Sequence, residues 1–397
     1  MFDAICFRDD ATADHKIDFG FLAEALVFYG KAHFIGDAVS CRRLLEGVGA
    51  PELLELAKQG QLDIHLVQQH AAAQTDGLGS GLERYDVALI EPADWNPRKE
   101  LKQAFLELAG GAKHSKMASD FMQHVNTVPR GHLRLPDIRT QIVDEPTFGA
   151  ATIAWIRELA PECLPEKPEV RCWTLGQSFQ VSSNVNLQCV SRALATKTGD
   201  DWEGFGFGSL LAYFISSHED AYFAAKLSAE IGTTPLRAPM IRARFDHLWN
   251  QNQESRKSLS EFSEVTLGSA RAIGDAIRQG RASFADLIRV LEERRKFREW
   301  LEGKPFDANL VAEYIIAVTR GSWLDKLPSK TVRWSVVSGL GLGSEIFAPS
   351  GIGSAVGLAI SAFDAFLLEH LARGWRPNQF VDEQLKKLTN QAGARKP

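Results

Sequence analysis

The first hundred residues alternate between short apolar stretches typical of strands and longer stretches with helical periodicity. A strand that is followed by a helix and then by another strand needs a crossover, and such units build parallel or mixed sheets. The sequence therefore predicts an α/β or α+β N-terminal region with a mixed sheet. The expected strands are 4–7, 31–35, 62–67 and 86–90, and the expected helices are 21–29, 40–45 and 51–60, with a surface loop at 75–81.

Residues 100–125 are expected to be helical, and prolines at 129, 136 and 146 then break the chain into irregular pieces. Prolines at 161, 165 and 168 mark a boundary, and 169–188 predicts a β-hairpin whose turn lies near Gly176. From about residue 210 to 327 apolar residues recur at helical spacing. At ~150 residues each, the chain of 397 residues has room for two or three domains. The expected domains are an α/β domain at 1–165, a hairpin with helices at 166–260, and a helical domain at 261–397.

The charge balance argues against a general nucleic-acid binder. The net charge is −5 and the isoelectric point is about 6.1, whereas such proteins usually carry a basic face. A local basic face would require a group of cations to lie together. The candidates for that group are Arg237, Arg242, Arg244, Arg256 and Lys257.

Cysteine usage and the N-terminal residues both indicate a cytoplasmic protein. The five cysteines are scattered and show no CxxC spacing, which predicts reduced thiols in the core. The first residues form a short apolar strand pattern followed at once by charged residues, without the basic start of a signal peptide. We therefore expect a cytoplasmic location, at most peripheral to an inner membrane.

No catalytic motif identifies a reaction. The chain lacks HExxH, GxSxG and a P-loop ending, so no catalytic residue is assigned, and no metal or cofactor is expected. His33 and His65 lie on expected strands, near edges where α/β proteins place ligands. The glycines of Gly204–Gly208 precede a helix, and their amides could bind an anion. The run His218–Asp220 is interpreted as a helix surface or cap.

The most unusual composition lies between Trp334 and Leu368, where 35 residues contain only two charges, Glu345 and Asp364. Pro349 divides the stretch into two arms, each too short or too charged for a transmembrane span. The sequence therefore predicts a glycine-rich helical hairpin at 334–371 that is buried unless something exposes it. Its small residues recur four apart and its ends carry Arg and Trp, a pattern typical of close helix contact or of a membrane interface. The predicted membrane- or partner-binding residues are Trp334, Gly339, Gly343, Gly353, Gly357, Arg373, Trp375 and Arg376.

Two short segments carry a resemblance. Leu327–Lys330 and Gly374–Val381, with the glycine-rich stretch between them, resemble the C-terminal part of a group of uncharacterised bacterial proteins. The resemblance covers about the last 120 residues. It implies a bacterial cytoplasmic origin, and it implies no activity.

Taken with the absence of catalytic motifs, these features predict a non-catalytic bacterial sensor or effector that acts through protein or membrane binding. Phage defence or a stress response is the expected setting. The expected partner is another protein or a second copy of the chain, with membrane contact only when the hairpin is exposed. The alternative is an enzyme whose site lies at the sheet edge near His33 and His65, or at Gly204–Gly208.

Overall fold

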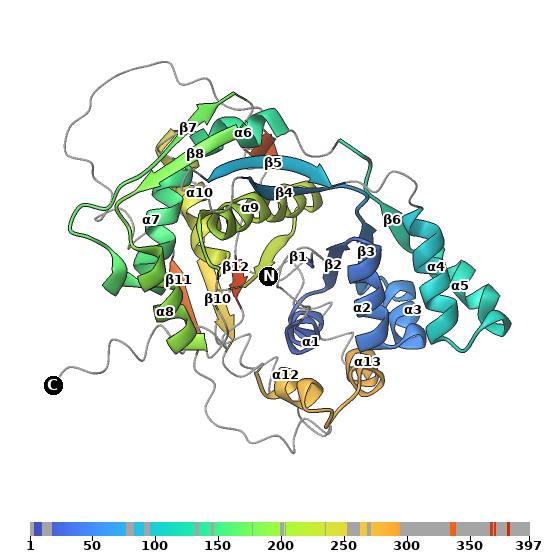
Figure 1. Ribbon diagram of the computed structural model, residues 1–397. Coiled ribbons are helices and arrows are strands. Elements are labelled where there is room, and N and C mark those ends of the chain that lie inside the picture. The colour runs from blue at the N-terminus through green and yellow to red at the C-terminus, as the bar shows by residue number, and fades with distance from the viewer. Residues whose placement is uncertain are drawn as a thin grey trace.

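The computed structural model contains two β-sheets with helices between and around them (Figure 1). One sheet has eight strands and is mostly parallel, and the other has four antiparallel strands. The α/β architecture predicted for the N-terminal region is therefore confirmed, but its strands divide between a parallel part of the larger sheet and the separate antiparallel sheet. The structure describes residues 4–9, 18–76, 83–90, 96–131, 135–143, 147–176, 178–198, 202, 204–234, 236–251, 263–267, 271–293, 334–338, 366–367, 369–370 and 379–381.

The larger sheet has the strand order β11-β10-β12-β9-β1-β2-β3-β6. Every pairing is parallel except that of β10 with β11. From β1 the chain adds β2, β3 and β6 on one side and then places β9 on the other side of β1. The strand order therefore reverses between β1 and β9, which is the switch point of an open α/β sheet. The strands are β1 (Ala4–Arg8), β2 (Lys31–Gly36), β3 (Leu62–Leu66), β6 (Val125–Thr127), β9 (Glu230–Thr233), β10 (Ser263–Leu267), β11 (Trp334–Ser338) and β12 (Gln379–Val381).

The N-terminal helices pack on one face of this sheet and enclose its largest apolar core. The predicted helix that begins near Pro51 is confirmed, with proline in its first turn as expected. The next helix upstream begins earlier than predicted, because Asp37 and not Ser40 accepts the capping hydrogen bond. The N-terminal helices are α1 (Phe19–Phe28), α2 (Ala38–Val48), α3 (Ala50–Lys58), α4 (Pro97–Leu108) and α5 (Ser115–Gln123), with the 3₁₀ turn η1 (Ala112–His114). Two helices from later in the chain, α12 (Arg271–Arg278) and α13 (Phe284–Glu293), pack against α1 and α3.

The smaller sheet has the order β4-β5-β8-β7 and its own apolar core. The hairpin predicted around Gly176 is confirmed, and Gly176 has a positive φ of 65° at the turn. The loop predicted at 75–81 is wrong at its start, because Thr75 and Asp76 pair in β4. The elements are β4 (His70–Asp76), β5 (Arg84–Ile90), β7 (Val170–Leu175), β8 (Ser178–Ser183), α6 (Leu135–Val143), α7 (Phe148–Leu159), η2 (Pro161–Cys163), α8 (Leu187–Thr198), α9 (Phe207–Leu227) and α10 (Ala238–Gln251).

The C-terminal half contributes strands where mainly helices were predicted. β9, β10, β11 and β12 all join the larger sheet, so that sheet takes strands from each of the three expected domains. The helical-hairpin prediction is wrong for 334–338, which form β11 and pair with β10. Of the predicted binding residues only Trp334 is described, at the start of β11. The others, Gly339, Gly343, Gly353, Gly357, Arg373, Trp375 and Arg376, lie outside the described residues.

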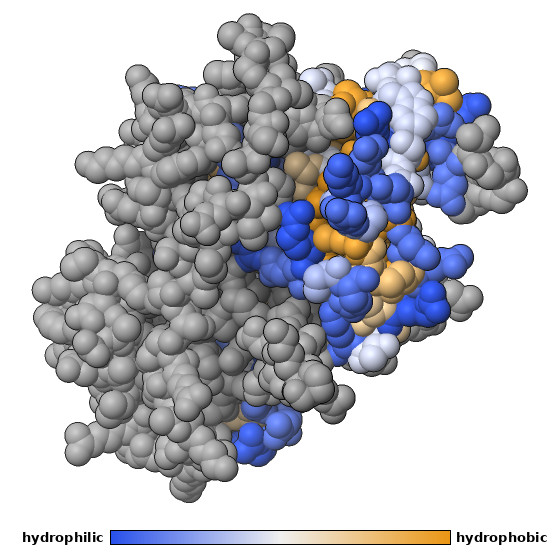
Figure 2. Space-filling view, turned by 90° about the vertical axis from the view of Figure 1, so that its left-hand side faces the viewer, coloured by the Kyte–Doolittle hydropathy of each residue, from blue (hydrophilic) through white to orange (hydrophobic). Residues whose placement is uncertain are grey.

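Within the described part of the chain, no helix has both the length and the apolar character needed to cross a bilayer. On the side of the molecule shown in Figure 2, the hydrophobic surface of the described residues forms a band bordered by hydrophilic residues. Large exposed apolar side chains occur on several separate elements, and two of them share the strand β7. They are Val39, Ile90, Leu108, Trp173 and Leu175.

Candidate functional site

A cavity of about 850 Å³ opens where helix α9 begins. Its walls come from the smaller sheet, from α8, and from the glycine-rich segment that leads into α9. The predicted glycine loop is therefore part of a real concave site, although most of the other lining residues were not predicted. The lining residues are Thr75, Glu83, Tyr85, Gln188, Ser191, Arg192, Gly204, Phe205, Gly206, Gly208 and Ser209.

Glycine is required at two positions in this wall. Gly204 has a φ of 79°, a conformation that residues with a side chain rarely adopt. A Cβ atom at Gly208 would lie 2.8 Å from the Thr75 hydroxyl oxygen, so only glycine lets α9 approach β4 this closely. Gly206 caps the helix without a side-chain hydrogen bond. The first N–H groups of α9 therefore emerge next to the cavity, where the helix dipole favours negative charge.

Aromatic side chains fix the shape of the cavity. The Phe205 ring stacks on the buried Trp155 ring, with ring centroids 5.5 Å apart, and Trp202 meets it edge-on at 5.6 Å. Tyr85, which also lines the cavity, stacks its ring on Phe179. These packed rings hold flat apolar surfaces beside the polar groups of the site.

The polar groups of the cavity carry both signs of charge. The Tyr85 hydroxyl donates a hydrogen bond to the Glu83 carboxylate. Burial of the ring, together with this hydrogen bond, raises the pKa of Tyr85 well above its ordinary value, so the phenol stays protonated. Arg192 on α8 supplies an exposed guanidinium, and its Nε also donates to the Gln188 carbonyl at 3.3 Å. Among the described residues, the cavity thus offers one cation, one carboxylate and several neutral hydrogen-bonding groups.

A disulfide holds the α8 wall in place. Cys163 in η2 and Cys189 in α8 are bonded, with Cα atoms 5.7 Å apart. The prediction of five reduced thiols is therefore wrong for these two residues. Cys189 lies in the same turn of α8 as the lining residues Gln188 and Ser191, so the bond ties this part of the wall to the end of α7.

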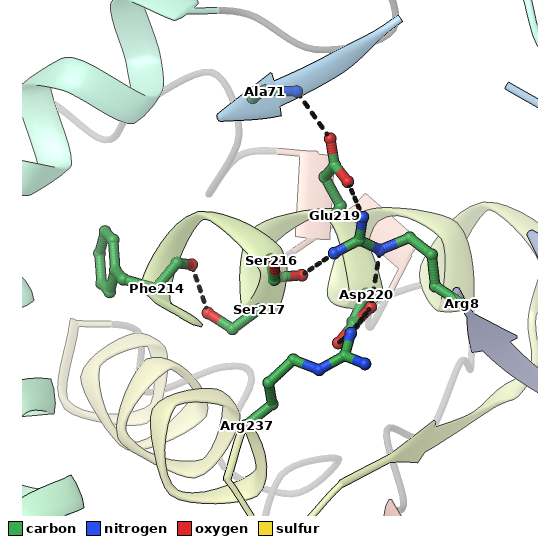
Figure 3. Close-up of polar contacts among 8 residues, drawn as sticks. All are labelled: Arg8, Ala71, Phe214, Ser216, Ser217, Glu219, Asp220 and Arg237. Atoms are coloured by element: carbon green, nitrogen blue, oxygen red, sulfur yellow. Dashed lines mark hydrogen bonds and ion pairs between the residues drawn. The ribbon is translucent and has the colours of Figure 1, made fainter. Parts of the chain in front are cut away.

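A buried ionic network lies about halfway along α9 (Figure 3). Arg8 is the last residue of β1, and its Nε donates to Asp220 at 3.0 Å. The same guanidinium forms an ion pair with Glu219 and donates to the Ser216 carbonyl at 3.3 Å. The Arg8 and Asp220 side chains are each about 2% exposed. Burial of charges at this depth requires pairing, and the geometry provides it.

The second half of the network completes the charge balance. The Arg237 guanidinium contacts both carboxylate oxygens of Asp220, at 3.3 and 3.1 Å. Glu219 accepts a hydrogen bond from the Ala71 N–H of β4 at 3.2 Å. Two arginines and two acids therefore connect both sheets through α9 (Figure 3). The interpretation of this run as a helix surface or cap is wrong, because its residues are buried.

The network also occupies the place where open α/β sheets usually bind ligands, which is beyond the carboxyl ends of the strands at the switch point. Arg8 ends β1, and Arg237 lies four residues after the end of β9. Both are committed to the carboxylates of α9. The cavity at the start of α9 is therefore the better candidate for a ligand site.

His218 is buried beside this network and is held neutral. Its Nδ1 lies 2.9 Å from the Phe214 carbonyl, and its Nε2 contacts the Gln141 side-chain amide. Burial lowers the pKa of His218 to about 3, and the nearby Arg244 contributes to this shift. A neutral ring has one N–H, which donates to Phe214. Gln141 must then turn its NH₂ group toward Nε2.

This burial predicts acid sensitivity. His218 has a pKa near 6.5 when unfolded and about 3 when folded, so below pH 6.5 the unfolded chain gains a proton that the folded chain does not. The stabilising contribution is full above pH 6.5 and falls by about 1.4 kcal/mol per pH unit, or about 2 kcal/mol at pH 5. Urea unfolding of the wild type and of His218→Gln at pH 7 and pH 5 measures this loss. The variant should lose about 2 kcal/mol less than the wild type over this interval, and equal losses would contradict the assignment.

His33 and His65 lie on strands as predicted, but they are not in the crevice beyond the strand ends. His33 is in the middle of β2 and His65 is one residue before the end of β3. They lie side by side on the face of the sheet near Lys226 of α9, with His33 Nδ1 3.1 Å from His65 Nε2. Burial lowers the pKa of each ring to about 4. The predicted site at the sheet edge is therefore corrected to a pair on the sheet face.

The basic residues that would form a nucleic-acid face are separated. Arg237 and Arg244 are buried, and Arg242 is paired with Glu158. The other two candidates, Arg256 and Lys257, lie outside the described residues. The described cations of this group therefore do not form a shared exposed face.

Comparison of the chain with protein-family models, with curated proteins and with solved structures finds no match.

Proposed function

We propose that the cavity at the start of α9 binds a small anionic organic molecule and that the protein is a ligand-dependent sensor. The observation that carries this proposal is the meeting of a helix N-terminus, Arg192 and the Phe205 ring around one cavity of about 850 Å³. That volume lies within the range of ~300–1,000 Å³ found for small-molecule sites. A sensor needs a ligand site of this kind, and the chain has no catalytic motif to suggest turnover.

The lining residues define the chemical class of the ligand. The helix N-terminus and Arg192 favour a phosphate or carboxylate group. Phe205 offers flat apolar surface to a ring, while the Tyr85 ring is buried against Phe179. Glu83 and the neighbouring hydroxyl groups can accept or donate hydrogen bonds to amino or hydroxyl groups. A nucleotide-sized molecule with one ring system and one or more anionic groups fits this combination.

Helix α9 supplies a physical route from the cavity to the rest of the protein. It spans 21 residues, beginning at the cavity, and its middle carries the buried ionic network that contacts both sheets. A ligand that orders the start of α9 would therefore act on an element already coupled to the larger sheet. In this proposal the output is the one predicted from the sequence, namely contact with a protein partner, or conditionally with a membrane, through 334–376. The setting expected from the sequence is a bacterial cytoplasm and a defence or stress response, and the Cys163–Cys189 disulfide argues against the cytoplasmic part of it, because disulfides are rare in reducing compartments.

The test is a binding screen with charge reversal in the cavity. Nucleoside mono-, di- and triphosphates, and cyclic and adenylated nucleotides, are screened by thermal shift and followed by titration calorimetry. A ligand at 100 times its Kd should stabilise the fold by about 2.7 kcal/mol. Arg192→Glu should weaken binding by at least about 10-fold, because it removes a charged hydrogen bond worth ~1.5–3 kcal/mol.

Arg171→Glu is the matched control, because Arg171 is an exposed arginine on β7 that does not line the cavity. This variant should bind the ligand as the wild type does. The proposal fails if no anionic compound binds, or if Arg192→Glu and Arg171→Glu bind it equally well.

A further inference from the structure

Two neighbouring strands bring three metal-binding side chains to one face of the larger sheet. In the parallel pairing of β2 with β3, His33 is opposite Asp63 and Ile35 is opposite His65. Residues two apart on a strand point to the same face, so Asp63 and His65 share a face. Residues opposite each other in adjacent strands also share a face, and therefore His33 joins them. The backbone pairing alone fixes this arrangement.

The distances between the side chains fit one shared ion. His33 Nδ1 is 3.1 Å from His65 Nε2 and 3.5 Å from the Asp63 Oδ2 atom. The three ligand atoms all lie within 4.8 Å of one another. Two nitrogen ligands of a tetrahedral zinc ion, each about 2.05 Å from the metal, lie about 3.4 Å apart. The observed separation therefore needs an adjustment of only a few tenths of an ångström.

The surroundings combine rigidity with access. His33 is buried, while Asp63 and His65 are half-buried, so an ion can approach from one side. The strands that carry the ligands, β2 and β3, each pair with a neighbouring strand on both sides. The backbone at the ligands is therefore rigid. A site with three protein ligands leaves a fourth position for water or another small ligand.

We propose that His33, Asp63 and His65 bind a divalent transition-metal ion, with zinc as the first candidate. Two imidazole nitrogens and one carboxylate are a ligand set for zinc, iron(II), cobalt or nickel, and they are a poor match for magnesium or calcium, which prefer oxygen. This site is separate from the cavity at the start of α9. It gives the protein a second ligand of a different chemical class.

Lys31 provides a further test of the proposal, because its ammonium group competes with the metal ion for the Asp63 carboxylate. Lys31 Nζ is 2.6 Å from the same Asp63 Oδ2 atom that approaches His33. A cation at this distance repels a metal ion and holds the carboxylate away from it. Lys31→Met should therefore strengthen metal binding. If the cluster were only a structural hydrogen-bond network, the same substitution would leave metal binding unchanged.

The experiment is a titration of untagged, chelator-treated protein with zinc chloride, followed by calorimetry and by elemental analysis after dialysis. The wild type should bind one ion per chain. His65→Asn should weaken binding by at least about 100-fold, since even outer-shell changes cost ~10–100-fold. Lys31→Met should strengthen binding several-fold. His114→Asn, a change of a histidine in η1 outside the cluster, is the control and should bind zinc as the wild type does.

Cobalt(II) gives a readout that needs no variant. Cobalt bound at this site should show the visible bands of a four-coordinate ion and should be displaced by zinc. Absence of a stoichiometric cobalt or zinc complex in the wild type overturns the proposal, as does equal binding by His65→Asn in a folded state. Arg192→Glu should bind zinc normally, so failure of the cavity proposal and failure of the metal proposal remain distinguishable.

Discussion

Asp220→Asn is expected to lower the free energy of unfolding by about 3–5 kcal/mol. Asp220 lies between two buried arginines, 3.0 Å from Arg8 Nε and 3.1 Å from Arg237 Nη1. Asparagine keeps the shape but removes the charge, so the buried Arg8 and Arg237 guanidinium groups would lose the carboxylate that they share. Urea unfolding at pH 7 measures this loss of stability. The loss should be large because the buried guanidinium groups have no nearby water to replace the lost carboxylate.

Two further variants test that explanation. Glu46→Gln removes the acid of an exposed ion pair with Arg42 on α2, and should cost less than about 1 kcal/mol. Asp220→Asn combined with Arg237→Met removes one uncompensated charge along with the acid, and should recover part of the stability. A loss for Asp220→Asn as small as that for Glu46→Gln would mean that the network is solvated in the folded protein.

The double change Cys163→Ser with Cys189→Ser is expected to lower the free energy of unfolding by about 3.5 kcal/mol. The bond closes a loop with a sequence separation of 26 residues, and the chain-entropy relation gives this value for such a loop. Loss of the bond should also weaken ligand binding, because α8 carries part of the cavity wall. Urea unfolding of the double variant, and of the wild type with and without a thiol reductant, provides the measurement.

The reduced wild type should match the double variant, and the double variant should not respond to reductant. Cys172→Ser is the control, since Cys172 is a free, half-buried cysteine on β7. It should keep the full response of the wild type to reductant. If oxidised wild type and the double variant unfold at the same urea concentration, the two thiols do not stabilise the fold through a bond.

Much of the N-terminal sheet could be predicted from local sequence. The strands β1, β2 and β3 are short apolar runs bounded by breakers, and the β7–β8 hairpin has a glycine at its turn. β4 was missed because its residues, His-Ala-Ala-Ala-Gln-Thr-Asp, have little intrinsic strand preference. It is a strand because it pairs along its whole length with β5. Pairing of this kind is decided by tertiary structure.

The candidate site was only partly visible for the same reason. The glycines at 204–208 gave a local signal, and they do line the cavity. Glu83, Tyr85 and Arg192 gave none, because they reach the cavity from β5, from the residue just before it, and from α8. The polar run on α9 was misinterpreted because a helix with adjacent charges usually faces solvent. Its Arg8 partner is 212 residues away in the sequence, so no local pattern could indicate the pairing with Asp220.

The position of β12 has a consequence for the order in which the protein can be completed during synthesis. β12 lies between β9 and β10, so among the described strands β10 and β11 connect to the rest of the sheet through residues 379–381. The other five strands of this sheet (β9, β1, β2, β3 and β6) can pair with one another while the chain is still being translated. The outer two strands must wait until residues 379–381 have left the ribosome. A chain cut short before residue 379 would therefore keep the centre of its larger sheet and lose the connection to β10 and β11.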